Sequence, residues 1–241
     1  MYEELRNILE QSNNVVFFGG AGVSTESGIP DFRSKDGLYN QHDVKFGKYE
    51  PEYLLSKDCL NYEPKVFYEF CRQKLDTRGI EPNVTHRVLA KLESLGKVKA
   101  VVTQNIDGLH QKAGSKCVYE IHGSTAQNCC QKCRKIFKSD VIFKSDGVPH
   151  CACGGMIRPN IVLYGESLPK DAVFNAIDAI KEADCLVVGG TSLSVYPAAG
   201  LLKYFKGKHL VVINKEELNV SGALVITDSL GKVFSEIEKW F

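Results

Sequence analysis

Short runs of consecutive apolar residues alternate along the chain with segments whose apolar residues recur at helical spacing. The most continuous runs begin at Val15, Val98, Cys185, Leu210 and Leu224. Uninterrupted apolar runs are typical of strands that are buried on both faces, and helices between strands are the usual connections of a parallel sheet. The pattern therefore predicts an α/β fold in which helices cover both faces of a parallel sheet.

Apolar residues recur at helical spacing near the start of the chain, in its middle and in its last third. A helix that begins after Pro82-Asn83 is expected to end at Gly96, since glycine often terminates helices. Residues 34–79 are aromatic and irregular, and their aromatic stripe is interpreted as helix packing. Further helices are expected over residues 2–12, 170–183, 197–205 and 233–241, and extended segments over residues 118–121 and 161–164.

Each predicted strand runs into small or polar residues, and ligands bind at the carboxyl edge of doubly wound sheets. Glycines directly after the first strand let a backbone approach a ligand, and the free N–H groups of the next helix favour a phosphate. The spacing of Gly20 and Gly22, with Thr25 in place of a third glycine, is only a partial dinucleotide-binding fingerprint. A plain tight turn is the alternative.

Composition narrows the class of protein. The 241 residues suit one substantial domain, or a large one with a small insert, and the net charge of +1 gives no support to a nucleic-acid or anionic-membrane partner. No signal peptide and no run of about 20 apolar residues is present, so no membrane partner is expected. Nine cysteines, several of them single within apolar segments, indicate a reducing compartment, and the chain is expected in the cytoplasm.

Two close pairs of cysteines predict a metal site. Cys130 and Cys133 form the first pair, residues 134–150 separate it from the second, and Cys151 and Cys153 form that second pair. This is the sequence form of a four-thiolate zinc site, and the segment has too few apolar residues to fold alone. Incidental buried thiols are the alternative, and Cys129 could replace Cys130. Four thiolates leave no open coordination position, so the single Zn²⁺ is expected to be structural.

Several motifs together resemble the sirtuin family, in particular the small bacterial NAD-dependent protein deacetylases. The resemblance extends from Val15 to Asp228, in the order in which the family carries the motifs. They are Gly20-Ala21-Gly22-Val23-Ser24, Gly28-Ile29-Pro30-Asp31-Phe32-Arg33, Thr103-Gln104-Asn105-Ile106-Asp107, His122-Gly123 and the paired cysteines.

The resemblance implies a Rossmann-type NAD-binding domain and a smaller domain. The large domain would comprise residues 1–33, 80–123 and 158–241, and the small one a helical insert at 34–79 with a zinc-ribbon module at 124–157. NAD would lie between the domains as co-substrate, and an acetyl-lysine of a protein substrate would enter from the opposite side. The products would be nicotinamide, free lysine and O-acetyl-ADP-ribose, and the protein is expected to be a monomer.

The resemblance also assigns residues. His122 matches the family's general base, and Asn105 is the second residue assigned to catalysis. The residues implied around NAD are Ala21, Thr25, Phe32, Arg33, Gln104, Ile106, Asp107, His122, Thr191, Ser192, Asn214 and Asp228. The residues implied on either side of an added substrate strand are Val162, Leu163, Tyr164, Gly165, Leu193, Ser194 and Val195.

Besides the shortened second cysteine pair, two departures from the family pattern stand out. Gly19 replaces the threonine of many members, which affects one side-chain hydrogen bond. Members that prefer acidic acyl groups tend to carry Tyr-x-x-Arg in the helical insert, whereas here Cys71 follows Tyr68 at that spacing and Arg72 comes one place late. The resemblance therefore implies acetyl or other neutral acyl groups.

The residue types suit this chemistry without the resemblance. The imidazole of His122 can accept a proton near neutral pH, and the amide and carboxyl groups of Gln104, Asn105 and Asp107 could bind an amide ligand such as nicotinamide. A structural histidine and ordinary turn residues are the alternatives. A dehydrogenase would need an acidic residue about 20 positions after the glycines, at the end of a strand, and the aromatic insert stands there instead.

Two other activities remain as alternatives. Transfer of ADP-ribose to protein side chains shares the first step of the expected reaction. A zinc module that docks on nucleic acid, motivated by Lys132, Lys135, Lys138 and Lys144, is the non-enzymatic alternative, although a solvated surface explains these lysines more simply.

Overall fold

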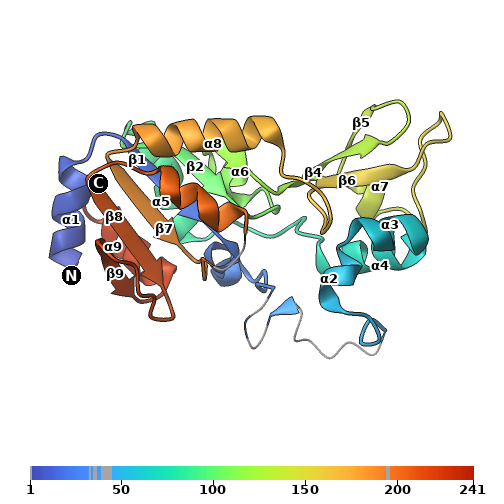
Figure 1. Ribbon diagram of the computed structural model, residues 1–241, viewed down its shortest axis with the longest axis horizontal. Coiled ribbons are helices and arrows are strands. Elements are labelled where there is room, and N and C mark those ends of the chain that lie inside the picture. The colour runs from blue at the N-terminus through green and yellow to red at the C-terminus, as the bar shows by residue number, and fades with distance from the viewer. Residues whose placement is uncertain (1, 33, 35–36, 39–44, 194–195) are drawn as a thin grey trace.

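A parallel sheet forms the larger part of the molecule (Figure 1). The computed structural model describes residues 2–32, 34, 37–38, 45–193 and 196–241. The apolar runs become buried strands, as expected for side chains covered on both faces. In spatial order the six strands are β3 (Val118–Glu120), β2 (Val98–Thr103), β1 (Val15–Gly19), β7 (Cys185–Gly189), β8 (His209–Asn214) and β9 (Ala223–Thr227).

All neighbouring strands of this sheet are parallel, and Val15 pairs with both Val98 and Cys185. The chain moves outward from β1 through β2 to β3 and then returns to the other side of β1 at β7. The order therefore reverses between β1 and β7, which is the topological switch point where doubly wound sheets bind ligands. The predicted α/β fold with a Rossmann-type sheet is confirmed.

Helices cover both faces of the sheet (Figure 1). Alternate strand residues point to opposite faces, so that Phe17 belongs to one apolar cluster and Phe18 to the other. The first face is covered by α1 (Tyr2–Gln11), α5 (Val84–Ser94) and α9 (Leu230–Glu238). The second is covered by α8 (Lys170–Glu182) and the 3₁₀ helix η4 (Ala198–Tyr204).

A smaller unit lies at the other end of the molecule, at the right of Figure 1, with an apolar cluster of its own. Tyr68 and Phe67 are fully buried in that cluster, and the Tyr68 hydroxyl donates to the Ile157 carbonyl at 2.7 Å. Its helices are α2 (Pro51–Leu54), α3 (Lys57–Tyr62), α4 (Pro64–Lys74) and α7 (Asp140–Phe143). Its antiparallel sheet has the order β5 (Ile136–Lys138), β4 (Gly123–Cys130), β6 (Ile157–Ile161).

The loops after β1 and β7 touch through glycine backbones at the switch point. The Gly22 amide donates to the Gly190 carbonyl at 2.8 Å, and the Gly20 amide donates to the Gly189 carbonyl at 3.2 Å. A Cβ on Gly190 would lie 2.5 Å from the Val23 nitrogen, and Gly190 has φ +61. Backbones can approach this closely only without side chains. Gly22 belongs to the first of two short 3₁₀ helices, η1 (Ala21–Val23), and η2 (Thr25–Ser27) follows it.

Three elements differ from the sequence prediction. The closing helix begins at Leu230 and not at Val233, because Ser229 accepts the Lys232 amide as N-cap. The strand expected at residues 161–164 lies earlier, at Ile157–Ile161, and includes Pro159, which an edge strand tolerates. The helix expected at 197–205 is a 3₁₀ helix. Within the described residues, no helix has the length and apolar character needed to cross a bilayer.

A buried histidine pair lies between α5 and α6 (Leu109–Ala113). The rings of His86 and His110 have centroids 4.7 Å apart, and both side chains are buried. Burial lowers the pKa of His86 to about 4 and that of His110 to about 3. His86 contacts the Asn83 Oδ1 through Nδ1 at 3.1 Å, and the Asn83 amide donates to the Val23 carbonyl at 2.8 Å. Through Asn83, His86 is therefore linked to the backbone of the glycine-rich loop.

Replacing Gly190 tests the backbone contact at the switch point. We expect Gly190→Ala to lower the free energy of unfolding by about 2 kcal/mol or more, because the added Cβ meets the Val23 nitrogen and φ is positive. Gly222→Ala is the matched control, since Gly222 has φ +76 but open space around its Cβ position, and it should lose about 1 kcal/mol. Urea denaturation gives both values, and equal losses would contradict the steric argument.

The histidine pair makes stability depend on pH. Because the pKa of each ring is lower in the folded protein, the unfolded chain binds more protons, and stability falls as pH drops below about 6.5. We expect a slope of about 1.4 kcal/mol per pH unit for each histidine between about pH 6 and 4.5.

Urea denaturation at several pH values measures this slope. His110→Phe should remove one histidine's share of the slope, whereas His150→Gln, at an exposed position, should leave it unchanged. A slope in His110→Phe equal to that of the wild type would exclude the buried ring as its source.

Candidate active site and metal centre

Three loops from the carboxyl edge of the sheet meet beside the switch point. The Gln104 side-chain amide donates to the Thr191 hydroxyl at 3.3 Å, which joins the loops after β2 and β7. The Gln104 backbone amide donates to the Gly19 carbonyl at the end of β1 at 3.0 Å. Thr191 also lies against Gly20, where an added Cβ would be 2.7 Å from the Thr191 Cβ. The ends of β1, β2 and β7 are therefore joined by direct contacts at the carboxyl edge, where the sequence predicts ligand binding.

His122 lies at the junction of the two sheets. It follows β3 and precedes Gly123, whose φ of +76 and close contact with the Asn160 carbonyl require glycine. The His122 Nδ1 lies 3.0 Å from the Gln104 carbonyl oxygen. Because a carbonyl can only accept, Nδ1 carries the proton of the neutral ring, and Nε2 has the lone pair. The half-buried ring is therefore held in the tautomer that a general base needs.

A buried polar network lies between the first two loops. The Asn105 side-chain amide donates to the Ser24 hydroxyl at 3.0 Å, and that hydroxyl donates to the Asp107 carboxylate at 2.7 Å. The other Asp107 oxygen accepts the Leu109 amide at the start of α6, at 2.8 Å. Burial raises the pKa of the Asp107 carboxyl, and these two donors oppose that shift. Asn105 is buried, so its amide is fixed by the protein before any ligand binds.

The other residues predicted around NAD make contacts of different kinds. The Thr25 hydroxyl donates to the Gly22 carbonyl, and Phe32 and Ile106 pack against the core of the smaller unit. Asp228 accepts bonds from the Tyr2 hydroxyl at 2.9 Å and the Lys232 amine at 2.6 Å. Asn214 donates to the Glu216 carbonyl. Ala21 and Ser192 lie in the loops that meet at the switch point, and Arg33 lies outside the described residues.

The first segment predicted beside a substrate strand is anchored on three sides. The Val162 amide donates to the His122 carbonyl at 2.9 Å, and the Leu163 amide donates to the Glu166 carboxylate at 3.0 Å. The Tyr164 amide donates to the Leu55 carbonyl, before α3, at 2.9 Å. Gly165 has φ +87 in the turn that follows. In the second segment Leu193 has φ +58, and Ser194 and Val195 lie outside the described residues.

The four predicted metal ligands form one cluster. The sulfur atoms of Cys130 and Cys153 lie 3.5 Å apart, those of Cys133 and Cys151 lie 3.7 Å apart, and all four lie within 4.8 Å of one another. Four thiolates around tetrahedral Zn²⁺, with Zn–S distances of about 2.3 Å, would be about 3.8 Å apart. The cluster therefore fits one zinc ion with no open position, so its role is structural.

Comparison with known proteins places this chain in a family. A model of the Sir2 family matches residues 20–197, which is most of the chain. The chain belongs to the Sir2 family. It is 52% identical over 240 residues to a protein of Cutibacterium acnes named NAD-dependent protein deacetylase, covering 98% of this chain and 97% of that one. A protein of the same name from Clostridium perfringens is 52% identical over 239 residues, covering 97% of each chain.

Solved Sir2 structures share the whole fold. One, a complex with a deacetylated p53 peptide and 3'-O-acetyl ADP-ribose, has a TM-score of 0.88 at 36% identity, covering 98% of this chain and 97% of that one. Another, with a p53 peptide and NAD⁺, has a TM-score of 0.85 at 38% identity, covering 99% and 98%. The prediction of a sirtuin from the sequence motifs is confirmed.

The structure resolves the choice between Cys129 and Cys130 as a zinc ligand in this sirtuin. Cys129 pairs with Ile136 and Arg158 across the antiparallel sheet and is absent from the sulfur cluster. The backbone amide of Cys133 approaches the Cys130 sulfur at 3.5 Å and helps to lower the pKa of that thiol to about 6. Cys130, and not Cys129, is therefore the cysteine that lies with Cys133, Cys151 and Cys153.

Ser24 is a residue of the sirtuin site that the sequence analysis did not assign. Its hydroxyl, 1% exposed, is the only link among the described residues between the side chains of Asn105 and Asp107. A serine in a glycine-rich loop gives no such signal by itself, because the bonds cross 81 and 83 residues of sequence.

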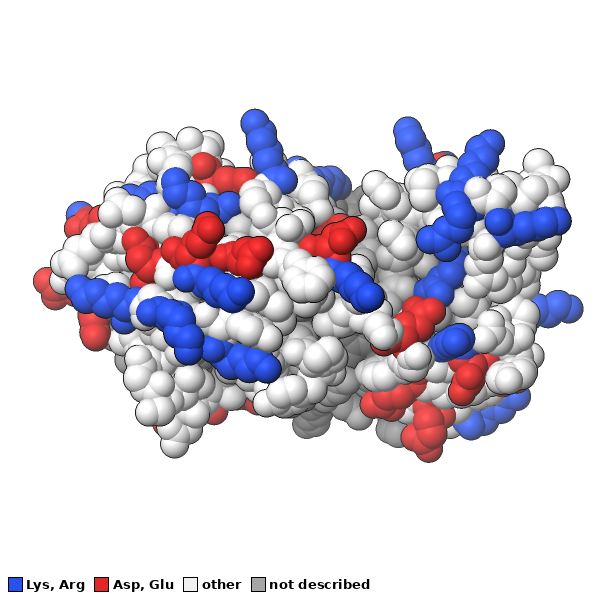
Figure 2. Space-filling model, turned by 45° about the horizontal axis from the view of Figure 1, so that its top comes forward, with Lys and Arg blue, Asp and Glu red and all other residues white. Residues whose placement is uncertain are grey.

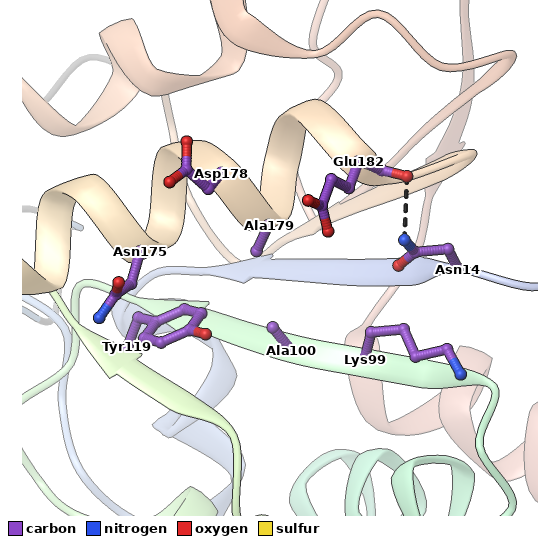
Figure 3. A pocket seen from close by; sticks show the side chains of 8 residues that line it. All are labelled: Asn14, Lys99, Ala100, Tyr119, Asn175, Asp178, Ala179 and Glu182. Carbon is purple, nitrogen blue, oxygen red and sulfur yellow. Dashed lines mark hydrogen bonds between the residues drawn. The ribbon is translucent and has the colours of Figure 1, made fainter.

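A pocket of about 340 Å³ lies away from these loops, beneath α8 (Figure 3). Asn14, Lys99 and Ala100 reach it from the amino-terminal ends of β1 and β2, and the Asn14 amide donates to the Glu182 carbonyl at 2.9 Å. The ligand-binding edge of a doubly wound sheet is the opposite, carboxyl edge. This pocket is therefore distinct from the predicted NAD site.

Cysteine substitutions test the metal centre. We expect purified wild-type protein to contain one zinc per chain and Cys130→Ser to lose it, together with stability, because three thiolates hold zinc less tightly. Cys129→Ser is the matched control, since the neighbouring thiol lies outside the cluster, and it should retain zinc. Elemental analysis and thermal unfolding measure both effects. Zinc loss in Cys129→Ser with retention in Cys130→Ser would reverse the assignment.

Proposed function

We propose that this sirtuin uses Asn105 and His122 to transfer an acetyl group from a protein lysine to the ADP-ribose part of NAD. NAD-dependent protein deacetylation is the activity of its relatives, and the prediction of that activity for this chain is confirmed. The residue assignment depends on one observation, which is that the two residues meet at the loop after β2. Asn105 is part of this loop, and the His122 ring is hydrogen-bonded to the Gln104 carbonyl of the same loop.

The first step is cleavage of the bond between nicotinamide and ribose. The nicotinamide amide needs both donors and acceptors, which the Asn105–Ser24–Asp107 network can supply. Ile106, between the two polar residues, packs toward the smaller unit and provides an apolar surface for the ring. The acetyl oxygen then attacks the anomeric carbon as the nicotinamide leaves with the electron pair of the broken bond. Positioning of the two substrates is the main contribution of these residues.

His122 performs the proton transfer that follows. Its Nε2 takes the proton of a ribose hydroxyl, and the resulting oxygen attacks the acetyl carbon, which is bonded to both the lysine nitrogen and the ribose oxygen at this stage. Positive charge that develops on the ring is stabilised by the Gln104 carbonyl at Nδ1. Water then releases free lysine and O-acetyl-ADP-ribose.

The substrate backbone is proposed to lie between residues 162–165 and 193–195. The amides of Val162, Leu163 and Tyr164 already donate within the chain. In the described part of the chain, the Val162 carbonyl and the Gly165 amide have no hydrogen-bond partner. These two groups are therefore the ones that an added substrate strand would use.

The proposed preference for neutral acyl groups is supported by the helical insert. The Tyr68 hydroxyl donates to the Ile157 carbonyl inside the core, and Arg72 donates to the Gly147 carbonyl at 2.8 Å. Cys71 is buried between them in sequence. These residues therefore supply no hydroxyl–guanidinium pair for an acidic acyl group.

The apolar clusters support most of the proposed domain division. Residues 1–33, 80–123 and 158–241 would form the NAD-binding domain, and residues 34–79 and 124–157 the small domain. Ile161 and Leu163, near the start of the third segment, pack in the core of the small unit. The boundary is therefore crossed by apolar contacts close to the substrate segment.

We further propose a cytoplasmic monomer that acts on acetylated-lysine proteins and does not bind nucleic acid. Figure 2 shows Lys and Arg gathered at the zinc-module end of one face, with both signs of charge interspersed elsewhere. Lys135 and Lys138 flank or belong to the edge strand β5. Lysines on edge strands oppose strand pairing with other molecules, which explains them without nucleic acid.

His122→Ala tests the assignment of the base. We expect the variant to retain its fold and NAD affinity but to lose deacetylation by about 100-fold or more, which is the usual contribution of a general base. An acetyl-lysine peptide is incubated with and without NAD, and mass spectrometry identifies both the peptide and the nucleotide products. His150→Ala, at an exposed histidine of the zinc module, is the control and should have the wild-type rate.

More than about a tenth of the wild-type rate in His122→Ala would contradict the assignment. The nucleotide product separates deacetylation, which gives acetyl-ADP-ribose, from transfer of ADP-ribose to protein, which leaves the label of labelled NAD on protein.

A further inference from the structure

An ion pair joins the strand β6 to the turn that follows the proposed substrate segment. Arg158, in β6, meets Glu166 in a two-pronged contact: Nη1 lies 2.5 Å from Oε1, and Nη2 lies 2.9 Å from Oε2. The two side chains are only 15% and 23% exposed. A partly buried, two-pronged pair is far more restrictive in geometry than the exposed ion pairs elsewhere on the chain.

Each member of the pair also binds backbone. The Arg158 Nη2 donates to the Ile161 carbonyl at 2.8 Å, and its Nε donates to the Pro159 carbonyl at 3.1 Å. These bonds fix the guanidinium against the end of β6. A lysine at this position would keep the charge but could not make the fork-shaped set of bonds.

Glu166 uses its carboxylate to fix the substrate segment. Oε2 accepts the Leu163 amide at 3.0 Å, and the Glu166 amide donates to the Leu163 carbonyl at 2.9 Å. The two bonds close a turn around Tyr164 and Gly165, where φ +87 permits the reversal. The turn presents the Gly165 amide at its corner, which is a group that the substrate is proposed to use.

The same segment reaches the proposed base. The residue before Leu163 is Val162, whose amide donates to the His122 carbonyl at 2.9 Å. Leu163 itself is 1% exposed in the small-unit core. A rigid path of bonded groups therefore runs from Arg158 through Glu166 and the segment to the backbone of His122.

The charge state of Glu166 suits this role. Burial raises the pKa of its carboxyl, but the bonds from Arg158 and from the Leu163 amide outweigh burial, so that the pKa is lowered overall. The carboxylate is thus charged at neutral pH and can accept from both donors. Removing one partner would leave the other charge partly buried and unpaired, which is costly.

We propose that Arg158 and Glu166 are positioning residues for the protein substrate: they hold residues 162–165 in the conformation that receives the acetyl-lysine backbone. Neither side chain needs to contact NAD or the reacting atoms. The proposal rests on the proposed function, because it assumes that this segment binds the substrate strand. The proposal explains what holds the segment in its conformation. It also predicts that the two residues affect affinity for the protein substrate but not affinity for NAD.

Steady-state kinetics of Glu166→Gln test the proposal. The single amide oxygen can still accept from Leu163, but the charge and the two-oxygen contact with the guanidinium are lost, so we expect the KM for an acetyl-lysine peptide to rise about 10-fold while kcat changes less than about 3-fold. The Kd for NAD, measured by calorimetry without peptide, should stay within about 2-fold of the wild type. Arg158→Lys should raise the peptide KM by a smaller factor than Arg158→Met.

Glu81→Gln is the matched control, because Glu81 forms an exposed pair with Lys112, and it should leave the peptide KM and the NAD Kd unchanged. Should Glu166→Gln fail to fold, Arg158→Lys gives the same comparison with the charge retained. An unchanged peptide KM in the folded variants would overturn the proposal, as would equal rises in the peptide KM and the NAD Kd. Absence of deacetylation by the wild type would instead contradict the proposed function.

Discussion

The backbone contact between the loops after β1 and β7 is the constraint on which the site depends. Gly20 and Gly22 lie directly against Gly189 and Gly190, and no side chain could be accommodated between them. Because the contact is made at the switch point of the sheet, it determines the position of the loops that follow the two central strands, β1 and β7. The loop after β2 is bonded to the same two loops, so all three are positioned by the sheet rather than by a ligand.

The smaller unit contributes to the site through its junction with the sheet. His122 stands between β3 and β4, so its backbone belongs to both units, while its ring is bonded to the loop after β2. A cluster of thiolates and an apolar core stabilise the unit from within. A zinc ion held by these cysteines would therefore act at a distance, by keeping the antiparallel strands and the segment after β6 in place, and would have no position for a reacting group.

Much of the fold could be predicted because the central strands are buried on both faces and read as uninterrupted apolar runs. The predicted start of the last helix was wrong, because the helix includes Gly231, whose missing side chain leaves room for the Glu26 carboxylate at that helix end. The position of β6 was also predicted wrongly, because the strand contains Pro159, and proline is tolerated in a sheet mainly on an edge strand such as this one. The motif residues of the site could be assigned by resemblance, but the role of Ser24 and the partners of Glu166 depend on bonds between distant segments.

The sulfur cluster also has a redox consequence. Thiols that lie 3.5 to 3.7 Å apart need only small movements to reach the 2.05 Å or so of a disulfide. While zinc occupies the cluster, the sulfurs are bonded to it and shielded from oxidants. Once the metal is removed in air, the same proximity favours cross-linking of Cys130 with Cys153 and of Cys133 with Cys151, which would prevent zinc from returning. Protein stripped of metal should thus regain zinc only when a reductant is present, and a count of free thiols would report the difference.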